Sequence, residues 1–339
     1  MESQVKEAYI IAEAGINHNG DLDIARRLVI DAFDSGCDAI KFQSFNPDEF
    51  IGDRSLMITY QDEKGRVIEE SQYEFFKRVM LPDDWHFELS SYCKEIGIDF
   101  LSSAADPYYV DILEKLNVPY IKIASEDIIN YKLLKYLGLK KIPVILSTGM
   151  ADEDEIRSAI NLLKGSRHII LLHCVSSYPT KIEEANVLRM VTLKEKFGMD
   201  VGYSDHTIGT ICCLAAATLG ARIIEKHFTL DKNMEGPDHK IALNPGEMKD
   251  MVVNIRDIGL CKGNGELKYR ACEEEGREKY RRTIVASRDL FKGNIISTED
   301  LDYKRTGRGL HPRETANLIG KKLNCDKRFN EIIEMGDVL

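Results

Sequence analysis

The chain has 339 residues, of which 43% are hydrophobic and 30% charged, a composition typical of a globular protein with a large domain and a small one. Its formal net charge of −10 argues against a nucleic-acid groove, and the absence of a signal-like start or a long apolar stretch predicts neither secretion nor a membrane span. The eight cysteines include no CxxC pair, so we expect reduced thiols in a cytoplasmic protein.

Eight short, mostly β-branched runs recur along the N-terminal two thirds of the chain. Most are separated by a segment with helical periodicity, such as residues 22–35 and 153–164. This pattern predicts a closed (β/α)8 TIM barrel. A doubly wound open sheet is the alternative, but no Gly-rich dinucleotide turn follows the first strand. The predicted strands lie at residues 9–11, 39–42, 100–101, 120–123, 144–146, 169–172, 201 and 223–224.

The second predicted strand is followed by a polar insertion, residues 46–81, rather than by a simple helix. Residues 52–54 and 62–65 combine glycine with charged side chains, which is typical of irregular structure. The sequence therefore predicts a long loop that lies over the C-terminal mouth of the barrel.

Polar side chains follow every predicted strand. The C-terminal ends of barrel strands form one face, and the desolvation cost of so many polar groups is too high for a purely structural cluster. We therefore expect the active site there. Lys41 and Lys122, each embedded in an apolar strand, predict a site for an anion such as a phosphate plus a carboxylate. The polar residues at the strand ends are Glu13, Lys41, Gln43, Ser102, Ser103, Lys122, Ser125, Ser147, Thr148, His173, Ser204, His206, Glu225 and His227.

The stretch Val201–Thr229 predicts a strand, a helix and a second, parallel strand. The two strands end at the same edge of the sheet, so His206 and His227 face one crevice. Two imidazoles with the carboxylates of Asp205 and Glu225 next to them predict a divalent-cation site that keeps positions open for water or substrate.

Two further histidines leave alternatives open. His18 lies in an Asn-His-Asn-Gly turn after the first strand and either belongs to the turn alone or contacts substrate. His173 ends the sixth strand and either packs inside the barrel, supports a metal ligand or is a third ligand itself.

The pattern changes toward the C-terminus. Residues 263–279 read as a linker between a barrel of residues 1–262 and a small module of residues 280–339. Short strands with tight turns, at residues 283–287 and 301–304, predict that this module is mainly β. About 60 residues are too few for a large core of their own.

Taken in order, these motifs resemble the sialic acid synthase family, phosphoenolpyruvate-condensing transferases that make nonulosonic acids of the N-acetylneuraminate and legionaminate types. The resemblance covers nearly the whole chain and implies a TIM barrel followed by an antifreeze-like (SAF, β-clip) domain. The matching segments are IAEAGINHNGDLDIA (11–25), AIKFQ (39–43), YIKIAS (120–125), LSTGM (146–150), HCVSSYPT (173–180), GYSDHT (202–207), EKHFTLDKNMEGPDHK (225–240) and RRTIVASRDLFKGNIISTEDLDYKR (281–305).

The resemblance implies a reaction. C3 of phosphoenolpyruvate attacks the aldehyde of an open-chain N-acetylmannosamine-type sugar, water adds at C2, and phosphate leaves by C–O cleavage to give a nine-carbon 2-keto sugar acid. His206 and His227 would hold a divalent cation that polarises the aldehyde oxygen, with Mn²⁺ expected and Mg²⁺ or Co²⁺ as alternatives. Phosphoenolpyruvate would contact Lys41, Ser103, Lys122, Ser125 and Ser204, and catalytic or sugar-positioning roles would fall to Glu13, Lys41, Gln43, Tyr178 and Glu225.

The resemblance also implies an assembly. In this family the antifreeze-like domain of one subunit covers the barrel of its partner in a domain-swapped homodimer, and Arg305 would there approach the acyl group of the substrate. The sequence departs from the family at Thr306, where many members have proline, and at Ala124–Asp127, where Gly-Ser-Gly-Glu is commoner. Substrate contacts at the fourth strand are therefore not transferred closely.

The sequence leaves several alternatives open. Another phosphoenolpyruvate condensation, of the KDO 8-phosphate or DAHP type, would need extra basic residues for a phosphorylated sugar. Within the family the sugar could be N-acetylmannosamine, its 6-phosphate or a 2,4-diacetamido-trideoxy sugar, and a pseudaminic acid synthase is a further option. A carbohydrate- or ice-binding protein would agree with the C-terminal module but would not require paired lysines and paired histidines at strand ends.

Overall fold

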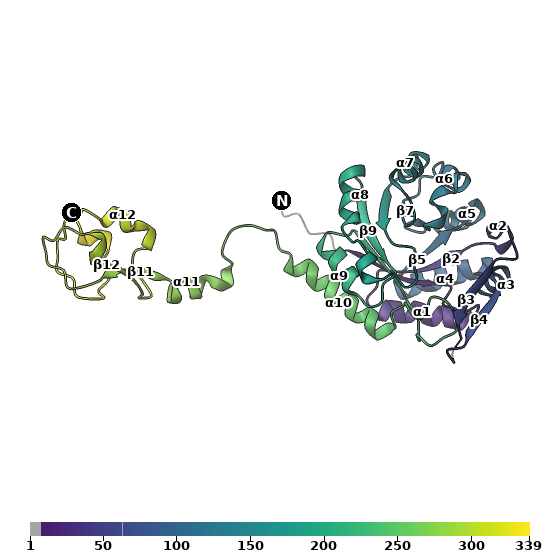
Figure 1. The fold of residues 1–339 in the computed structure, drawn as a ribbon, viewed down its shortest axis with the longest axis horizontal. Coiled ribbons are helices and arrows are strands. Elements are labelled where there is room, and N and C mark those ends of the chain that lie inside the picture. The colour runs from purple at the N-terminus through teal and green to yellow at the C-terminus, as the bar shows by residue number, and fades with distance from the viewer. Residues whose placement is uncertain (1–7, 63) are drawn as a thin grey trace. The chain divides into compact units, whose positions relative to one another are not determined.

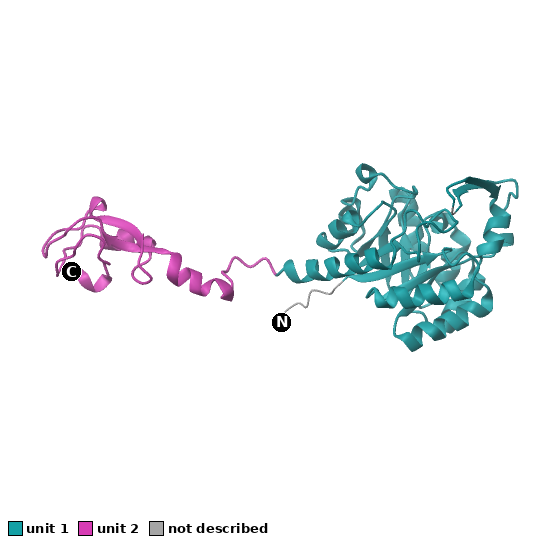
Figure 2. Cartoon of the chain, turned by 90° about the horizontal axis from the view of Figure 1, so that it is seen from below, with its two compact units in different colours: residues 1–263 teal, residues 264–339 magenta. Residues whose placement is uncertain are grey.

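The computed structural model describes residues 8–62 and 64–339. Two compact units make up the chain, Met1–Gly263 and Asn264–Leu339, and Figure 2 shows them in different colours. Residues 1–7, which bear on the expectation that no signal peptide is present, lie outside the described residues. Within the described ranges, we find no helix with the length and apolar character needed to cross a membrane.

The first unit is built on a closed barrel of eight parallel strands in the order β1-β10-β9-β8-β7-β6-β5-β2 (Figure 1). Each strand expected from the sequence is present, which confirms the predicted (β/α)8 barrel. The barrel strands are β1 (Tyr9–Gly15), β2 (Ala39–Ser44), β5 (Asp99–Ala104), β6 (Ile121–Ile123), β7 (Val144–Ser147), β8 (Ile169–His173), β9 (Asp200–Asp205) and β10 (Ile223–His227).

Helices connect successive strands and pack their apolar faces on the outside of the barrel. The first helix starts where predicted, because the Asp21 side chain accepts hydrogen bonds from the backbone N–H groups of Asp23 and Ile24. A capping box between Asp152 and Glu155 starts α7 in the same way. The helices of the barrel are α1 (Leu22–Asp34), α4 (Asp83–Ile96), α5 (Pro107–Leu116), α6 (Tyr131–Leu137), α7 (Glu153–Leu162), α8 (Arg189–Phe197), α9 (Ile211–Thr218) and α10 (Pro245–Cys261).

Alternation along the strands decides what fills the barrel, because successive strand residues point to opposite faces. In β2 the inward residue Ala39 is followed two positions later by Lys41, and in β10 Ile223 is followed by Glu225. The interior is therefore apolar toward the N-terminal ends of the strands and polar toward their C-terminal ends. The apolar cluster inside the barrel consists of Ile11, Ala39, Leu101, Ile145, Ile170, Leu172 and Ile223.

The insertion after β2 is folded, so the prediction of a long loop was wrong. Ile16, Tyr60 and Phe75 belong to a small buried core that holds it against the barrel. Aromatic residues that are spread over several short elements give no single hydrophobic periodicity, so the sequence pattern predicted a loop. Ile58 and Phe76 reach a cavity at the C-terminal ends of the strands, in the region where the insertion was expected. Its elements are α2 (Pro47–Phe50), the antiparallel pair β3 (Met57–Gln61) and β4 (Val67–Ser71), and α3 (Gln72–Val79).

The second unit has a separate apolar core around Ile284, Leu301 and Leu323. Its antiparallel strands confirm the two predicted in this region, and the C-terminal part of the segment read as a linker is helical. The elements are α11 (Glu274–Tyr280), β11 (Arg282–Ala286), β12 (Leu301–Arg305) and α12 (Thr315–Leu318).

Candidate active site

A cavity of about 280 Å³ opens at the C-terminal ends of the barrel strands. Twelve residues were predicted for the site, and eleven of them line this cavity. They are Glu13, Lys41, Gln43, Ser103, Lys122, Ser125, Tyr178, Ser204, His206, Glu225 and His227. The twelfth, Arg305, lies at the end of β12 in the second unit.

Two lysines and two glutamates meet in the wall of this cavity, and each of the four side chains is at most 5% exposed. The ammonium group of Lys41 lies 2.6 Å from Oε2 of Glu13 and 3.8 Å from Oε2 of Glu225. Lys122 donates to Oε1 of Glu225 over 3.1 Å, and Gln43 donates to Oε1 of Glu13 over 3.1 Å. Buried charges of both signs are arranged here with their partners, as burial demands.

The two glutamates differ in their pKa values. Burial raises the pKa of Glu13 above its usual range, although the Lys41 ammonium opposes the shift. Burial acts in the same direction on Glu225, but Lys122 and Lys41 outweigh it and lower the pKa of Glu225 to about 2. Two carboxylates whose pKa values are pushed apart can take different roles, one carrying a proton and the other staying ionised.

Hydroxyl groups add neutral donors to the cavity. Ser204 donates to Oε1 of Glu225 over 2.8 Å, and the Oγ of Ser125 lies 3.1 Å from the thiol of Cys174. Gly149 lies against this group, because a Cβ there would come within 2.7 Å of the Ser125 Oγ and within 2.4 Å of the Ser176 Oγ. The Ser176 hydroxyl is buried without a hydrogen-bond partner among the described residues.

His206 and His227 lie together at the ends of β9 and β10, with ring centroids 5.4 Å apart. Nδ1 of His206 lies 2.6 Å from the carbonyl oxygen of Val175, so it carries the proton and donates it. This leaves Nε2 of His206 as the nitrogen with a free electron pair. The Tyr178 ring packs over the pair, with its centroid 4.2 Å from that of His206 and 5.9 Å from that of His227.

The donor set fits a divalent cation. Burial lowers the pKa of both His206 and His227, in the case of His227 well below its usual range, so both imidazoles are neutral and able to bind a metal. A ring nitrogen held by a backbone carbonyl, as in His206, is the usual support for a metal-binding histidine. No group of three or more His, Cys, Asp or Glu side chains in residues 8–62 and 64–339 is arranged to hold a metal, so water or substrate would complete the coordination.

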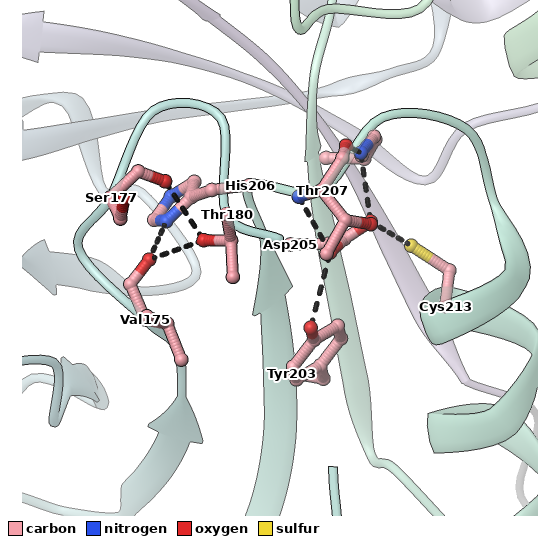
Figure 3. A network of polar contacts seen from close by, with 9 residues as sticks. Val175, Ser177, Thr180, Tyr203, Asp205, His206, Thr207 and Cys213 are labelled. Atoms are coloured by element: carbon pink, nitrogen blue, oxygen red, sulfur yellow. Dashed lines mark hydrogen bonds and ion pairs between the residues drawn. The ribbon is translucent and has the colours of Figure 1, made fainter. Parts of the chain in front are cut away.

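Asp205 does not belong to this cation site, contrary to the expectation from its place beside His206. Its side chain points to the outside of the barrel, toward Tyr203, Thr207 and Cys213 (Figure 3). The reason is the alternation of β9, which sends Ser204 inward and Asp205 outward.

The two histidines left open by the sequence lie outside the cavity wall. His18 is buried against Phe42 and Trp85 and accepts a hydrogen bond at Nδ1 from the backbone N–H of Gly20. His173 is buried, and its Nε2 lies 2.8 Å from the carbonyl oxygen of Ala185. Both histidines therefore have a packing role. For His173, packing inside the barrel was one of the alternatives that the sequence left open.

Several cavity residues were not predicted from the sequence. Asp238, in the loop after β10, lies 3.5 Å from Nδ1 of His227, and burial raises the pKa of its carboxyl to about 7. Glu126 and Cys174 follow strands, whereas Ile58 and Phe76 come from the insertion. Residues in loops carry no periodic signal, so the segments compared with the family, which contain Glu126, Cys174 and Asp238, did not mark these side chains as part of the cavity.

The comparisons with known proteins agree with this geometry. Residues 28–267 match the NeuB family and residues 281–339 match the SAF domain. The chain is 43% identical over 325 residues to the N,N'-diacetyllegionaminic acid synthase of Legionella pneumophila, covering 94% of this chain and 91% of that protein. It is 41% identical over 333 residues to the enzyme of the same name from Campylobacter jejuni, covering 97% and 99%.

A solved structure gives the same result. The N-acetylneuraminic acid (sialic acid) synthetase of Leptospira borgpetersenii, crystallised with citrate, superposes with a TM-score of 0.71 at 35% sequence identity. The match covers 80% of this chain and 90% of that one. The chain therefore belongs to the NeuB family and carries a SAF domain, which confirms the resemblance to sialic acid synthases inferred from its motifs.

Proposed function

We propose that this protein condenses phosphoenolpyruvate with an uncharged N-acetylmannosamine-type amino sugar to give a nine-carbon 2-keto sugar acid and phosphate. The observation that carries the proposal is the convergence of Lys41, Lys122, Glu225 and the His206–His227 pair on one cavity of a NeuB-family barrel. Holding two reactants side by side in such a cavity supplies a large share of the rate of a condensation.

Phosphoenolpyruvate carries a carboxylate and a phosphate, and the cavity offers a matching pair of ammonium groups. Lys41 and Lys122 are the Lys and Arg side chains among the described residues that line it. Glu225 lies between them and fixes their positions through contacts of 3.8 and 3.1 Å. The hydroxyl groups of Ser103, Ser125 and Ser204 supply further donors to the anion.

His206 and His227 would hold the divalent cation, for which we propose Mn²⁺. When bound, the ion supplies Lewis acidity toward the aldehyde oxygen of the sugar. Tyr178 covers both rings and shields this side of the cavity from bulk water. Gln43 orients Glu13 by its hydrogen bond to Oε1.

The reaction forms one C–C bond, from C3 of phosphoenolpyruvate to the aldehyde carbon, and breaks the C–O bond to phosphate after water adds at C2. A proton must reach the former aldehyde oxygen, and the adding water must lose one. Glu13, whose pKa burial raises, is the group that we propose transfers these protons. Glu225 remains ionised and balances the charges of Lys41 and Lys122.

The cavity favours an uncharged sugar over a phosphorylated one. No Lys or Arg beyond Lys41 and Lys122 lines it in the described part of the chain, and both are needed for phosphoenolpyruvate. Ile58 and Phe76 line it from the insertion, and such apolar groups suit acetamido methyl groups or a deoxy carbon. Together with the similarity to two N,N'-diacetyllegionaminic acid synthases, this supports a 2,4-diacetamido-2,4,6-trideoxy sugar as the substrate.

The SAF domain is proposed to complete the site of a partner subunit in a homodimer. Arg305 lies on β12 with its guanidinium 5.6 Å from the ring centroid of Tyr280, and neither residue belongs to the unit that contains the cavity. A cationic side chain with five donors suits the carbonyl oxygen of an acyl group.

A panel of sugars tests the proposed substrate. Phosphate release from phosphoenolpyruvate is measured with the 2,4-diacetamido-2,4,6-trideoxy sugar, N-acetylmannosamine, N-acetylmannosamine 6-phosphate and arabinose 5-phosphate. We expect the first sugar to give the highest kcat/KM and the two phosphorylated sugars to give none. A preference for either phosphorylated sugar would contradict the proposal.

A further inference from the structure

Asp205 on β9 and Lys226 on β10 lie next to residues of the cavity but on the opposite face of their strands. Asp205 stands between Ser204 and His206, and Lys226 is adjacent to His227, so both alternate with residues of the cavity. They are paired in register across the two strands and point to the outside of the barrel. Their side chains meet under α9, which packs on both strands.

The two side chains form a fully buried ion pair. Nζ of Lys226 donates to Oδ2 of Asp205 over 2.8 Å, and both side chains are 0% exposed. Asp205 also accepts from the Tyr203 hydroxyl over 3.1 Å and from the Cys213 thiol over 3.4 Å (Figure 3). Each Asp205 oxygen has more than one donor, so the carboxylate is held in one orientation.

Thr207, the residue that follows His206, is held by this pair from three sides. Its backbone N–H and its hydroxyl each donate to Asp205 over 3.1 Å. Its carbonyl oxygen accepts from Nζ of Lys226, which lies on the neighbouring strand. The end of β9 that carries His206 is therefore tied to the residue next to His227 on β10.

Stability alone does not account for this arrangement. A buried ion pair contributes little compared with well-packed apolar side chains of the same size, and replacing such a pair by apolar groups is often neutral or stabilising. What apolar groups cannot supply is the directional hydrogen bonding that Thr207 receives. Polar groups behind a metal ligand often serve to orient it.

We propose that Asp205 and Lys226 are positioning residues that set the separation of His206 and His227 through Thr207. The proposal rests on the metal site of the proposed function. The pair does not touch substrate or the reacting atoms, and its effect appears as the affinity of the protein for Mn²⁺. Loss of the pair lets the two strand ends relax independently, so fewer molecules present both imidazoles at the required distance.

The test is the double variant D205L/K226M in the full-length chain, which removes both charges together and leaves neither unpaired. The Mn²⁺ Kd is measured by the electron paramagnetic resonance of free Mn²⁺, and folding is followed by the thermal melting temperature. We expect a lowered melting temperature, because the hydroxyl of Tyr203 and the backbone N–H and hydroxyl of Thr207 lose Asp205 as their acceptor. In the protein that remains folded, we expect a Kd raised roughly 10- to 100-fold. The variant D205N/K226Q, which keeps hydrogen-bonding groups, should recover part of the affinity.

Controls keep the result unambiguous. Ser102 on β5 belongs to a buried polar cluster with Ser44 on β2 and His86 on α4, away from β9 and β10, so Ser102→Ala should leave the Kd unchanged. A folded D205L/K226M protein with the Kd of the wild type would overturn the proposal. If this variant does not fold, Thr207→Val decides, since it removes only the hydroxyl donor to Asp205. A Kd raised roughly threefold or more supports the proposal, and an unchanged one overturns it.

The Mn²⁺ affinity of the wild type distinguishes failure of the metal site from failure of its positioning by Asp205 and Lys226. Wild-type protein that binds Mn²⁺ and loses affinity only in the variants supports both the metal site and its positioning. Wild-type protein that binds Mn²⁺ as tightly as folded D205L/K226M contradicts the positioning role alone. Wild-type protein that binds no Mn²⁺ contradicts the proposed metal site, and with it this inference.

Discussion

The ammonium group of Lys122 lies 3.1 Å from Oε1 of Glu225, a distance that joins the middle of the barrel sequence to its last strand. Because Glu225 also lies 3.8 Å from Lys41, one carboxylate holds two cations that a doubly charged anion can bridge. This arrangement is the basis of the proposed phosphoenolpyruvate site.

Lys122→Ala should therefore raise the KM for phosphoenolpyruvate and leave that for the sugar nearly unchanged. Loss of one charged hydrogen bond costs about 1.5–3 kcal/mol, or roughly 10- to 100-fold in affinity. Steady-state kinetics with each substrate varied in turn measures both constants. Lys181→Ala, at a lysine outside the cavity wall, serves as the control. An unchanged KM for phosphoenolpyruvate would remove Lys122 from the anion site.

His206→Ala and His227→Ala should each lower kcat/KM by roughly 100-fold or more, since each removes one of the two proposed protein ligands to the ion. The fold should survive, because both side chains line a cavity and leave no gap in the main apolar core. Circular dichroism checks folding, and isothermal titration with Mn²⁺ checks binding. Full activity of both variants in chelated buffer would contradict the metal site.

Much of this site could be predicted from the sequence, because the barrel converts strand ends into one face. Glu13, Lys41 and Glu225 each end an apolar run, so the cavity followed from the fold. The same alternation predicts that Asp205 points to the outside of the barrel, but its place beside His206 in the sequence suggested a metal ligand instead. Asp238 was missed because it lies in a loop, where spacing in sequence says little about spacing in the fold.

The insertion illustrates a different limit. Its core depends on Tyr60 and Phe75, which come from different short elements and meet only after a hairpin forms. No window of the sequence shows a single period across these residues, and the polar faces of β3 and β4 dominate the composition. Tertiary contacts, rather than local propensity, determine the structure here.

Asp127→Asn should stabilise the protein at neutral pH but not in acid. Burial raises the pKa of Asp127 to about 6, so the folded state binds a proton more tightly than the unfolded state does. The corresponding stability is fully present below about pH 4 and is lost as the pH rises through 6, a loss of up to about 3 kcal/mol. The amide keeps an acceptor for Asn130, which donates to Asp127 over 3.1 Å.

Urea unfolding between pH 4 and pH 8 measures this difference. The gain in the free energy of unfolding for Asp127→Asn should be near zero at pH 4 and approach its maximum above pH 7. A gain that does not change with pH would mean that Asp127 stays ionised in the folded protein.

Mixing two inactive variants tests whether subunits share sites. If Arg305 completes the cavity of the partner subunit, co-expressed Arg305→Ala and His206→Ala chains should form mixed dimers with one intact site. Activity should return to about half the wild-type value per mixed dimer, by the symmetry of a two-fold assembly. Verified mixed dimers without activity would mean that each subunit uses its own Arg305 or none.

Phosphate release from phosphoenolpyruvate with the 2,4-diacetamido-2,4,6-trideoxy sugar tests the metal-dependent condensation most directly. We expect phosphate and a nine-carbon 2-keto acid in equal amounts, no turnover after treatment with EDTA, and recovery when Mn²⁺ is restored. Mass spectrometry of the product and a phosphate assay give both quantities from one reaction. Absence of a condensed product with every unphosphorylated amino sugar, or full turnover in EDTA, would contradict it.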